Sequence, residues 1–342
     1  MYKYFIVVLI LVSGLLAQTT ANPDISVIGQ LHIASDHDTT ILNASNLELA
    51  ATGYLNPYAR AEVYLHKEAS EAAFEVEEAY ASIERGLPLG LALRAGKFRP
   101  TFGKINREHA HLWSFVTTPT AVAQFSGEEL WSGTGLEMSW FLPLSWYSQL
   151  SASALTSGMS TAAHGSHVDQ EDHAGEETVS SPALCLRNSH FMEITPIMHL
   201  QAGASYYREE STDKSLAAMD AKLKWKPDAY RGFVLQTEVY FNLSPEPAGD
   251  DSTAEHMAQL GTYSYFEYRF NQRWNLGLLL DVVKHHEEDA EISPSVFLVF
   301  SPVAESLVLR LVLTDRVEGN EHNPLLQSQL IWSLGPHKPH TF

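Results

Sequence analysis

Apolar and polar residues alternate along most of the chain with a period of two. In 304–315, for example, Leu309, Leu311 and Leu313 share one parity, and Arg310 and Val312 share the other. A strand turns successive side chains to opposite faces, so the pattern predicts strands with one apolar and one mixed face. No long stretch keeps a convincing helical period. The chain is therefore predicted to be all-β.

About sixteen segments follow this pattern, and most have the length that a tilted strand needs to cross a bilayer. The predicted strands are 24–34, 46–55, 57–67, 73–84, 89–97, 130–141, 145–157, 181–193, 196–208, 214–226, 231–242, 257–270, 273–285, 292–301, 304–315 and 324–334. Several large aromatic residues near the strand ends fit the girdles found at membrane interfaces, although packed cores would use them too. They are Tyr54, Trp131, Trp140, Trp146, Trp225, Trp274 and Trp332.

The connections between these strands are of two kinds. Tight links such as Asn56-Pro57 and Asn271-Gln272 follow the even-numbered strands, and polar, usually longer loops follow the odd-numbered ones. Short turns at one rim, long loops at the other and an even strand count are typical of bacterial outer-membrane barrels. A soluble β-sandwich or propeller needs no such asymmetry. We therefore predict a transmembrane antiparallel β-barrel.

The two ends of the chain carry further signals. Residues 1–21 combine a single lysine, an apolar run over 5–17 and small residues before Asn22. This pattern predicts a cleaved signal peptide, because the run is too short to span a bilayer. We expect residues 22–342 to form the barrel and to be exported through the periplasm. The last residue, Phe342, resembles the aromatic terminus that the barrel-assembly machinery reads in outer-membrane proteins.

Composition excludes several classes of protein. The 342 residues hold 41 acidic and 22 basic side chains, a formal net charge of −19, which argues against nucleic acid as a partner. A single cysteine, Cys185, excludes an internal disulfide framework and any cysteine-rich metal site. The chain also lacks GxSxG, HExxH and a phosphate-cradling glycine loop, so we predict no enzyme.

Several segments resemble a known family. They are 93–106, 109–113, 127–135 and the tail 334–340. The chain resembles Gram-negative outer-membrane porins related to the phosphate-selective porins, and it is most similar to the branch described as zinc-regulated outer-membrane proteins. The resemblance implies a sixteen-stranded barrel that is usually a homotrimer. It also implies a third external loop that folds inward and narrows the pore.

Residues 98–129 match that loop in position and composition. The resemblance implies that its charged residues set a transverse field across a narrow water path. These candidate constriction residues are Arg99, Lys104, Arg107, Glu108, His109, Glu128 and Glu129. The alternative is that Phe98, Phe102, Trp113 and Phe115 simply pin a long loop to the wall.

Charged residues at the lumen parity of the predicted strands are of both signs. The candidate lumen residues are Arg60, Glu62, Arg94, Lys222, Lys224, Glu238, Glu267, Arg269 and Arg310. A phosphate-selective pore would be expected to show a dense ladder of basic residues. Because the lumen is predicted to be mixed, phosphate selectivity is not carried over from the family.

Two loops combine histidine with carboxylates, ligand types that suit zinc and similar ions. The candidate metal ligands are His164, His167, Asp169, Asp172 and His173 in one loop and His285 and His286 in the other. Their spacing matches no fixed motif, and a solvated acidic loop with a few histidines is the alternative. No cofactor is expected to be required, and weak zinc capture is the hypothesis.

Together these features predict a passive porin for small hydrophilic solutes or ions. It would lie in the outer membrane of a Gram-negative bacterium, in contact with lipid and lipopolysaccharide. The alternative is a surface metal-binding protein, in which the barrel anchors external loops rich in His, Asp and Glu. Conductance separates the two, because an anchor with a filled lumen passes no current.

Overall fold

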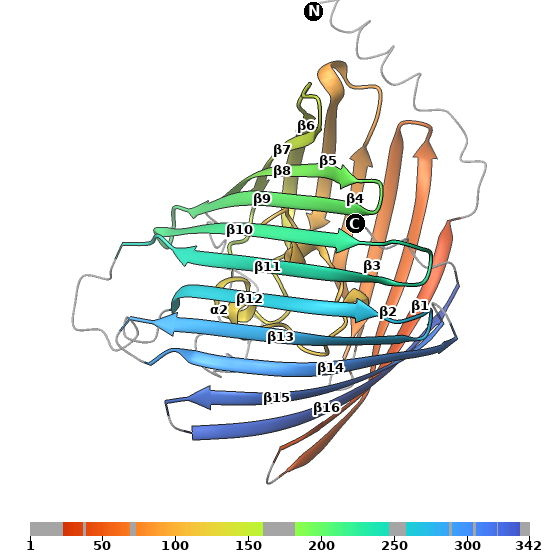
Figure 1. Cartoon of the computed structure of the whole chain (residues 1–342). Coiled ribbons are helices and arrows are strands. Elements are labelled where there is room, and N and C mark those ends of the chain that lie inside the picture. The colour runs from red at the N-terminus through yellow and green to blue at the C-terminus, as the bar shows by residue number, and fades with distance from the viewer. Residues whose placement is uncertain are drawn as a thin grey trace, which may run out of the picture.

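A computed structural model describes residues 23–36, 39–68, 73–159, 182–245, 258–286, 289–303, 306–319 and 321–335. Within these residues, sixteen antiparallel strands form a closed barrel, and each strand pairs with its neighbours in sequence (Figure 1). The barrel closes where β1 (Asp24–Ser35) pairs with β16 (Glu321–Leu334). The predicted fold class and strand number are confirmed.

The other strands lie close to their predicted ranges. They are β2 (Thr40–Asn56), β3 (Ala59–Lys67), β4 (Glu75–Ile83), β5 (Leu91–Phe98), β6 (Gly133–Phe141), β7 (Tyr147–Leu155), β8 (Ala183–Thr195), β9 (Met198–Glu209), β10 (Lys214–Trp225), β11 (Gly232–Asn242), β12 (Ala258–Arg269), β13 (Trp274–His285), β14 (Glu291–Val303) and β15 (Leu307–Glu318). A one-turn 3-10 helix, η1 (Pro88–Gly90), precedes β5. The largest difference is at β2, which begins at Thr40 instead of residue 46. Beyond a register shift at Gln30/Leu31, β1 continues to pair with residues 40–44, although these residues do not alternate in polarity.

The two faces of the strands differ as the alternation predicts. On β15, Leu309, Leu311 and Leu313 are 42%, 46% and 50% exposed on the outside, whereas Arg310 and Val312 turn inward and are buried. If such side chains stayed in water, the protein would lose about 25 cal/mol of hydrophobic stabilisation for each Å² of apolar surface left exposed. An outer surface of this kind is favourable in hydrocarbon.

Most of the aromatic residues assigned to interfacial girdles lie on the outer surface. Trp140, Trp146, Trp274 and Trp332 are exposed there. The assignment is wrong for Trp131, which is buried inside the barrel with its indole N–H donating to the carbonyl oxygen of Ser157 at 3.0 Å. Trp131 precedes β6 and belongs to a segment that turns inward, so it fills the interior.

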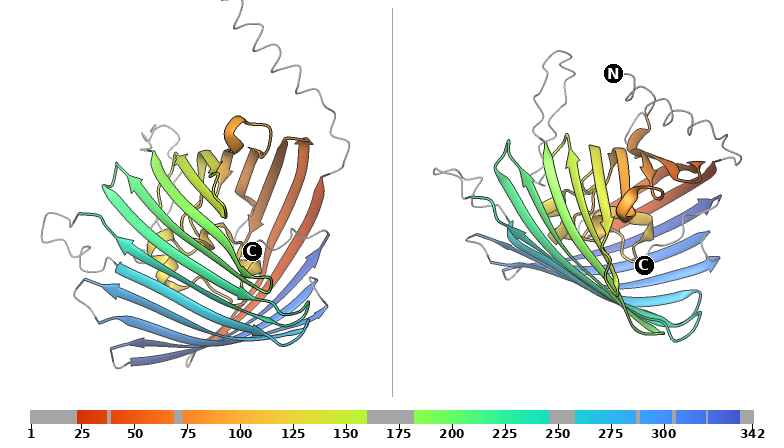
Figure 2. Two further views of the ribbon diagram at one scale, coloured as in Figure 1. Left: turned by 45° about the horizontal axis from the view of Figure 1, so that its top comes forward. Right: turned by 90° about the horizontal axis from the view of Figure 1, so that it is seen from above.

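That segment, residues 99–132, is here called the inward loop. It connects β5 to β6 and carries η2 (Ile105–Arg107), η3 (Ala110–Leu112) and the helix α2 (Thr120–Ser126) inside the barrel (Figure 2). The helix contacts β11, β12 and β13. Phe102 and Phe125 of the loop pack on Tyr240 of the wall. This confirms the predicted inward-folded third loop. No helix in the described part of the chain is long and apolar enough to cross a membrane.

Carboxylates of the wall fix the position of the inward loop. Glu238 of β11 accepts the backbone N–H groups of Lys104 and Ile105 at 2.8 and 2.9 Å. Asp281 of β13 accepts the N–H groups of the first residues of α2, which supplies the cap that the helix start otherwise lacks. Gly103 has φ +62°, and a Cβ there would meet a carboxylate oxygen of Glu238, so this position strongly favours glycine. The loop is therefore held against the wall around β11–β13.

Candidate pore constriction

Two cavities occupy the interior of the barrel. One, of about 570 Å³, reaches the rim of the loops that follow odd-numbered strands, where Glu68 lies just after β3. The other, of about 530 Å³, reaches the rim of the short turns, where Tyr147 begins β7. We call them the long-loop cavity and the short-turn cavity. They share three lining residues, Glu48, Arg99 and His109, which therefore form the partition between them.

The two cavities carry opposite balances of charge among the described residues. The long-loop cavity has seven glutamates against three Lys or Arg: Glu48, Glu68, Glu75, Glu77, Glu128, Glu129 and Glu291, with Lys97, Arg99 and Arg316. The short-turn cavity has three glutamates against four basic residues: Glu48, Glu78 and Glu108, with Arg99, Lys104, Arg107 and Arg187. A solute crossing the barrel would pass from an acidic to a weakly basic region.

Arg99 joins the start of the inward loop to β4. Its guanidinium pairs with Glu77 and donates to the carbonyl oxygen of Glu129 at 3.1 Å. Its backbone N–H donates to Glu78 Oε2 at 2.9 Å. The side chain is buried, and the negative charge of Glu77 opposes the field of its guanidinium group.

The consecutive residues Glu77 and Glu78 both face the partition because β4 is bulged. Tyr64 pairs with Glu78 and Leu65 with Val76, so Glu77 is the extra residue of a β-bulge. An extra residue breaks the alternation of faces and can re-aim a side chain toward a site. The bulge thus doubles the carboxylates beside the loop.

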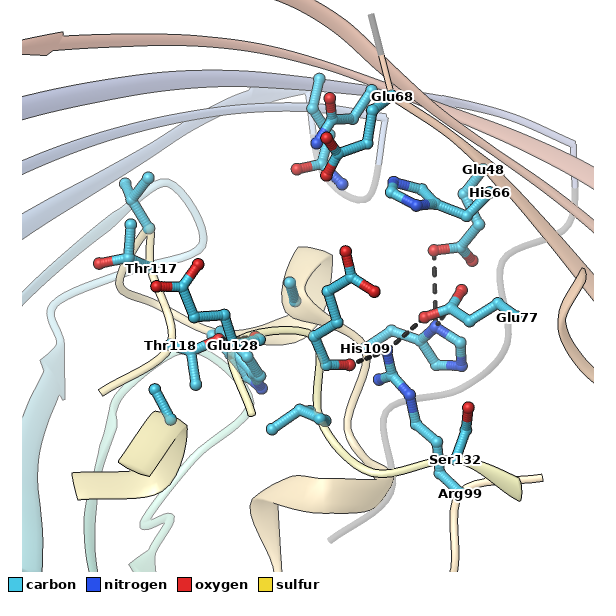
Figure 3. A pocket seen from close by; sticks show the side chains of 18 of the residues that line it. Glu48, His66, Glu68, Glu77, Arg99, His109, Thr117, Thr118, Glu128 and Ser132 are labelled. Atoms are coloured by element: carbon cyan, nitrogen blue, oxygen red, sulfur yellow. Dashed lines mark hydrogen bonds and ion pairs between the residues drawn. The ribbon is translucent and has the colours of Figure 1, made fainter. Parts of the chain in front are cut away.

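His109 lies at the centre of these carboxylates. Its Nε2 is 3.1 Å from Glu78 Oε1, and its Nδ1 is 3.5 Å from Glu48 Oε2 and 3.6 Å from Glu77 Oε2. Figure 3 shows Glu48 and Glu77 turned toward the ring of His109 from β2 and β4. Burial lowers the pKa of His109, but the negative charge of these carboxylates outweighs it and holds the pKa well above its usual value.

Lys104 lies on the short-turn side of the partition. Its Nζ donates to Gln201 Oε1 at 2.6 Å and is 3.7 Å from Glu108 Oε1, which is also 3.8 Å from Lys222 Nζ. Burial lowers the pKa of Lys104 to about 8, although Glu108 opposes the shift. The charge of this side chain is therefore adjustable near neutral pH.

The predicted constriction residues do not form one ring. Arg99 and His109 lie in the partition, Lys104, Arg107 and Glu108 line the short-turn cavity, and Glu128 and Glu129 are exposed in the long-loop cavity. The loop runs along the wall through the interior, so residues close in sequence reach different depths of the barrel.

The predicted lumen residues fall into two sets. The first set is Arg60, Glu62, Arg94, Lys222, Lys224 and Arg269. In it, Arg60 pairs with Glu62 at 3.2 Å, Arg94 pairs with Glu137 at 3.5 Å, and Lys222 faces Glu108. Lys224 and Arg269 lie at the same strand parities as the inward-facing Lys222 and Glu267.

Glu238, Glu267 and Arg310 form the second set and are buried beneath the inward loop. Glu238 is fully buried, Glu267 accepts the Ser114 hydroxyl, and Arg310 donates to the His111 carbonyl oxygen at 2.7 Å. The expectation that these three line the water path is corrected, because the loop covers them.

Sequence reasoning left several polar residues of the interior out of the candidate site. Glu48, Glu78, Arg187 and Asp220 are buried, and Glu77 and His111 are half-buried. Strand parity places Glu48 and Asp220 on the inner face, and the motif at 109–113 contains His111, but nothing in the sequence signals the bulge that turns Glu77 inward. Arg187 of β8 and Asp220 of β10 form a bidentate pair at 2.6 and 3.0 Å across the intervening strand β9.

Most of the predicted metal ligands lie outside the described residues, as do the leader 1–21 and Phe342. The ligands concerned are His164, His167, Asp169, Asp172 and His173. His285 ends β13 and His286 follows it. Zinc capture by either loop stays a prediction.

Comparison with known proteins identifies the fold. No family model matches the chain. An uncharacterized protein of Aquifex aeolicus is 27% identical over 266 residues, which cover 72% of this chain and 55% of that protein. The chain thus matches about half the length of this curated relative.

Solved structures of outer-membrane proteins superpose over nearly the whole chain. Pseudomonas putida OprB, solved at high pH, has a TM-score of 0.62 at 9% identity and covers 92% of this chain and 94% of its own. A triple mutant of the Rhodopseudomonas blastica porin has a TM-score of 0.59 at 11% identity, and the match covers 91% of this chain and 100% of the porin. The outer membrane channel DcaP of Acinetobacter baumannii has a TM-score of 0.58 at 12% identity, and the match covers 93% of this chain and 99% of DcaP. The chain has the fold of sixteen-stranded outer-membrane porins. The phosphate-selective and zinc-regulated branches stay predictions.

Proposed function

We propose that the protein is a passive outer-membrane channel for small hydrophilic solutes and ions, with a preference for cations. The observation that carries this proposal is the pair of oppositely charged cavities that meet at Glu48, Arg99 and His109. The porin fold and the apolar outer surface support it. The channel acts by diffusion through water, filtered by the inward loop, and no residue is assigned a catalytic role.

The direction of the charge asymmetry follows from the loops. In bacterial outer-membrane barrels the long loops face the exterior and the short turns face the periplasm. The acidic long-loop cavity would then open to the exterior and raise the local concentration of cations. We further propose contacts with lipid and lipopolysaccharide, assembly by the barrel-assembly machinery, and a homotrimer.

Neutralising the long-loop cavity tests the proposed cation preference. In the triple variant Glu68→Gln, Glu128→Gln and Glu129→Gln, the cavity loses three negative charges without loss of volume. We expect the reversal potential in a salt gradient to move toward zero, measured as single-channel current of the refolded protein in a planar bilayer. The effect should shrink at high salt, which screens the cavity.

A matched triple variant distinguishes this local effect from net charge. Glu84, Glu193 and Glu321 are exposed glutamates that do not line either cavity. Their replacement by glutamine should leave the reversal potential unchanged. Equal shifts in both triple variants would show that the cavity does not set selectivity.

Lys104 predicts a pH dependence of the same selectivity. The groups that face it are Glu108 on the loop, Asp220 and Lys222 on β10, and Glu238 on β11. Because its pKa is lowered to about 8, Lys104 is charged at pH 6 and neutral at pH 10. Raising the pH should therefore increase cation preference, with a midpoint near 8.

In Lys104→Met the rise in cation preference near pH 8 should be absent. The cation preference of this variant at pH 6 should already equal the one that the parent reaches at high pH. The control Lys226→Met removes an exposed lysine of the β10–β11 turn and should retain the step. A step that persists in Lys104→Met would assign it to another group.

The surface metal-binding alternative makes a different electrical prediction. A barrel that only anchors histidine-rich loops would give no current steps, although it folds and inserts. Silence from a demonstrably folded barrel would replace the channel proposal with this alternative.

A further inference from the structure

The partition contains three side chains with the spacing of metal ligands. Ligand atoms of Glu48, His109 and His111 all lie within 4.8 Å of one another, and this is the one such group found in the described part of the chain. His111 Nδ1 is 3.1 Å and His109 Nδ1 is 3.5 Å from Glu48 Oε2. Ligands of a tetrahedral zinc ion, at about 2.1 Å from the metal, are about 3.4 Å apart.

Two atoms of this group are buried without a hydrogen-bond partner. They are His109 Nδ1 and Glu48 Oε1, and their residues are only 8% and 6% exposed. Buried polar atoms are paired in nearly all native structures, so each exception asks for an explanation. A cation bound between the imidazole and the carboxylate would displace to solvent the proton that the carboxylates favour on His109, and would engage both atoms.

The surroundings orient His109 as metal-binding histidines are oriented. Its other nitrogen, Nε2, lies 3.1 Å from Glu78 Oε1, which itself is held through its second oxygen by the backbone N–H of Arg99. A carboxylate behind a ligating imidazole fixes the ring and its tautomer. Here that arrangement leaves Nδ1 directed at Glu48 and at Glu77 Oε2, 3.6 Å away.

We propose that Glu48, His109 and His111 bind a divalent cation of the zinc type, with Glu77 as a fourth ligand, and that the bound ion reduces current through the partition. Two imidazoles with carboxylates favour zinc and its transition-metal neighbours over magnesium or calcium, which prefer oxygen ligands throughout. The acidic long-loop cavity gives cations access, because Glu48, Glu77 and His109 line it. The reduction of current rests on the proposed channel function, whereas the binding does not.

Binding is tested on the full chain refolded in detergent, with Zn²⁺ titrated against a chromophoric chelator and Co²⁺ followed by its visible absorption. Loss of a second-shell partner alone typically costs 10–100-fold in affinity, so Glu48→Gln and His111→Ala should weaken zinc binding by about 100-fold or more. His111→Cys should restore binding and add a thiolate signature to the cobalt spectrum. His322→Ala, which removes an exposed histidine paired with Asp315, should bind as the parent does.

The same titrations are made in a chain that lacks residues 164–177, so that zinc on that loop does not mask the site. Heat-dependent migration in gels confirms that each variant is folded. If folded Glu48→Gln and His111→Ala both retain the tight cobalt site, the proposed site is overturned. If deletion of residues 164–177 by itself abolishes tight cobalt binding, the proposed site at Glu48, His109 and His111 is likewise overturned.

Single-channel currents keep the two proposals apart. We expect Zn²⁺ to reduce the current of the parent channel and not that of His111→Ala. A cobalt site that depends on His111 in a barrel that never conducts would support the site and overturn the channel. Current steps without such a site would support the channel and overturn the site. If zinc is shown to fill the site and the current does not change, the proposed reduction of current by the bound ion is overturned.

Discussion

Replacing Glu238 with alanine is expected to detach the first half of the inward loop from the wall. The carboxylate accepts the N–H groups of Lys104 and Ile105 and the hydroxyl groups of Tyr240 and Tyr263. Its loss leaves buried donors unpaired, at about 1–3 kcal/mol each, so docking of the loop should weaken by about 3–5 kcal/mol. A detached loop no longer narrows the barrel. The single-channel conductance should therefore rise, and Lys104 and Arg107 should become cleavable by trypsin.

Two further variants show what such a result means. Glu238→Gln keeps the shape of the side chain and its acceptor oxygen, so it should fall between the parent and the alanine variant. Glu193→Ala removes an exposed glutamate of β8 and should change neither conductance nor cleavage. If Glu238→Ala also changes neither, the remaining contacts, namely the packing of Phe102 and Phe125 and the Asp281 cap of α2, are sufficient to hold the loop.

The second large effect is expected at the pair Arg187–Asp220. Both side chains are buried, and Arg187 also donates to Ser205 Oγ at 2.9 Å. Breaking a buried ion pair leaves an uncompensated charge at a cost of about 3–5 kcal/mol. Arg187→Ala should therefore lower the free energy of unfolding by that amount, measured by urea titration in detergent. The double variant Arg187→Met, Asp220→Leu should recover most of the loss, because no charge is then left buried.

The exposed pair Arg231–Asp228 in the β10–β11 turn, at 2.8 Å, provides the control. Solvent screens such pairs, so Arg231→Ala should change the unfolding midpoint little. A double-mutant cycle on Arg187 and Asp220 that shows no coupling would mean that water reaches the pair and hydrates both charges.

The barrel could be predicted from the sequence because the exterior and the interior of the barrel impose a period of two on the polarity of each strand. Each strand meets an apolar exterior on one face and an interior of mixed polarity on the other, so residues such as Leu311 and Arg310 alternate. Alternation thus gave the strand number, and the turn chemistry at sites such as Asn56 and Asn271 gave the boundaries. The resemblance of residues 93–135 to porins added the inward loop.

The roles of individual charged residues were not readable in the same way. Parity placed Glu238 and Arg310 on the inner face, but whether an inner residue lines water or lies beneath the loop depends on where the loop docks. Trp131 illustrates the same difficulty, since an aromatic residue near a strand end can serve a membrane interface or an interior equally well.

What the sequence determined by itself is the barrel and the set of residues that face its interior, because a period of two is a local property that each strand displays alone. Only the tertiary structure decided which of these residues meet. Glu48, Glu77 and His109 come from β2, a bulge in β4 and the inward loop. Their convergence depends on strand register, the bulge and loop docking together, and these are long-range interactions that no local pattern encodes.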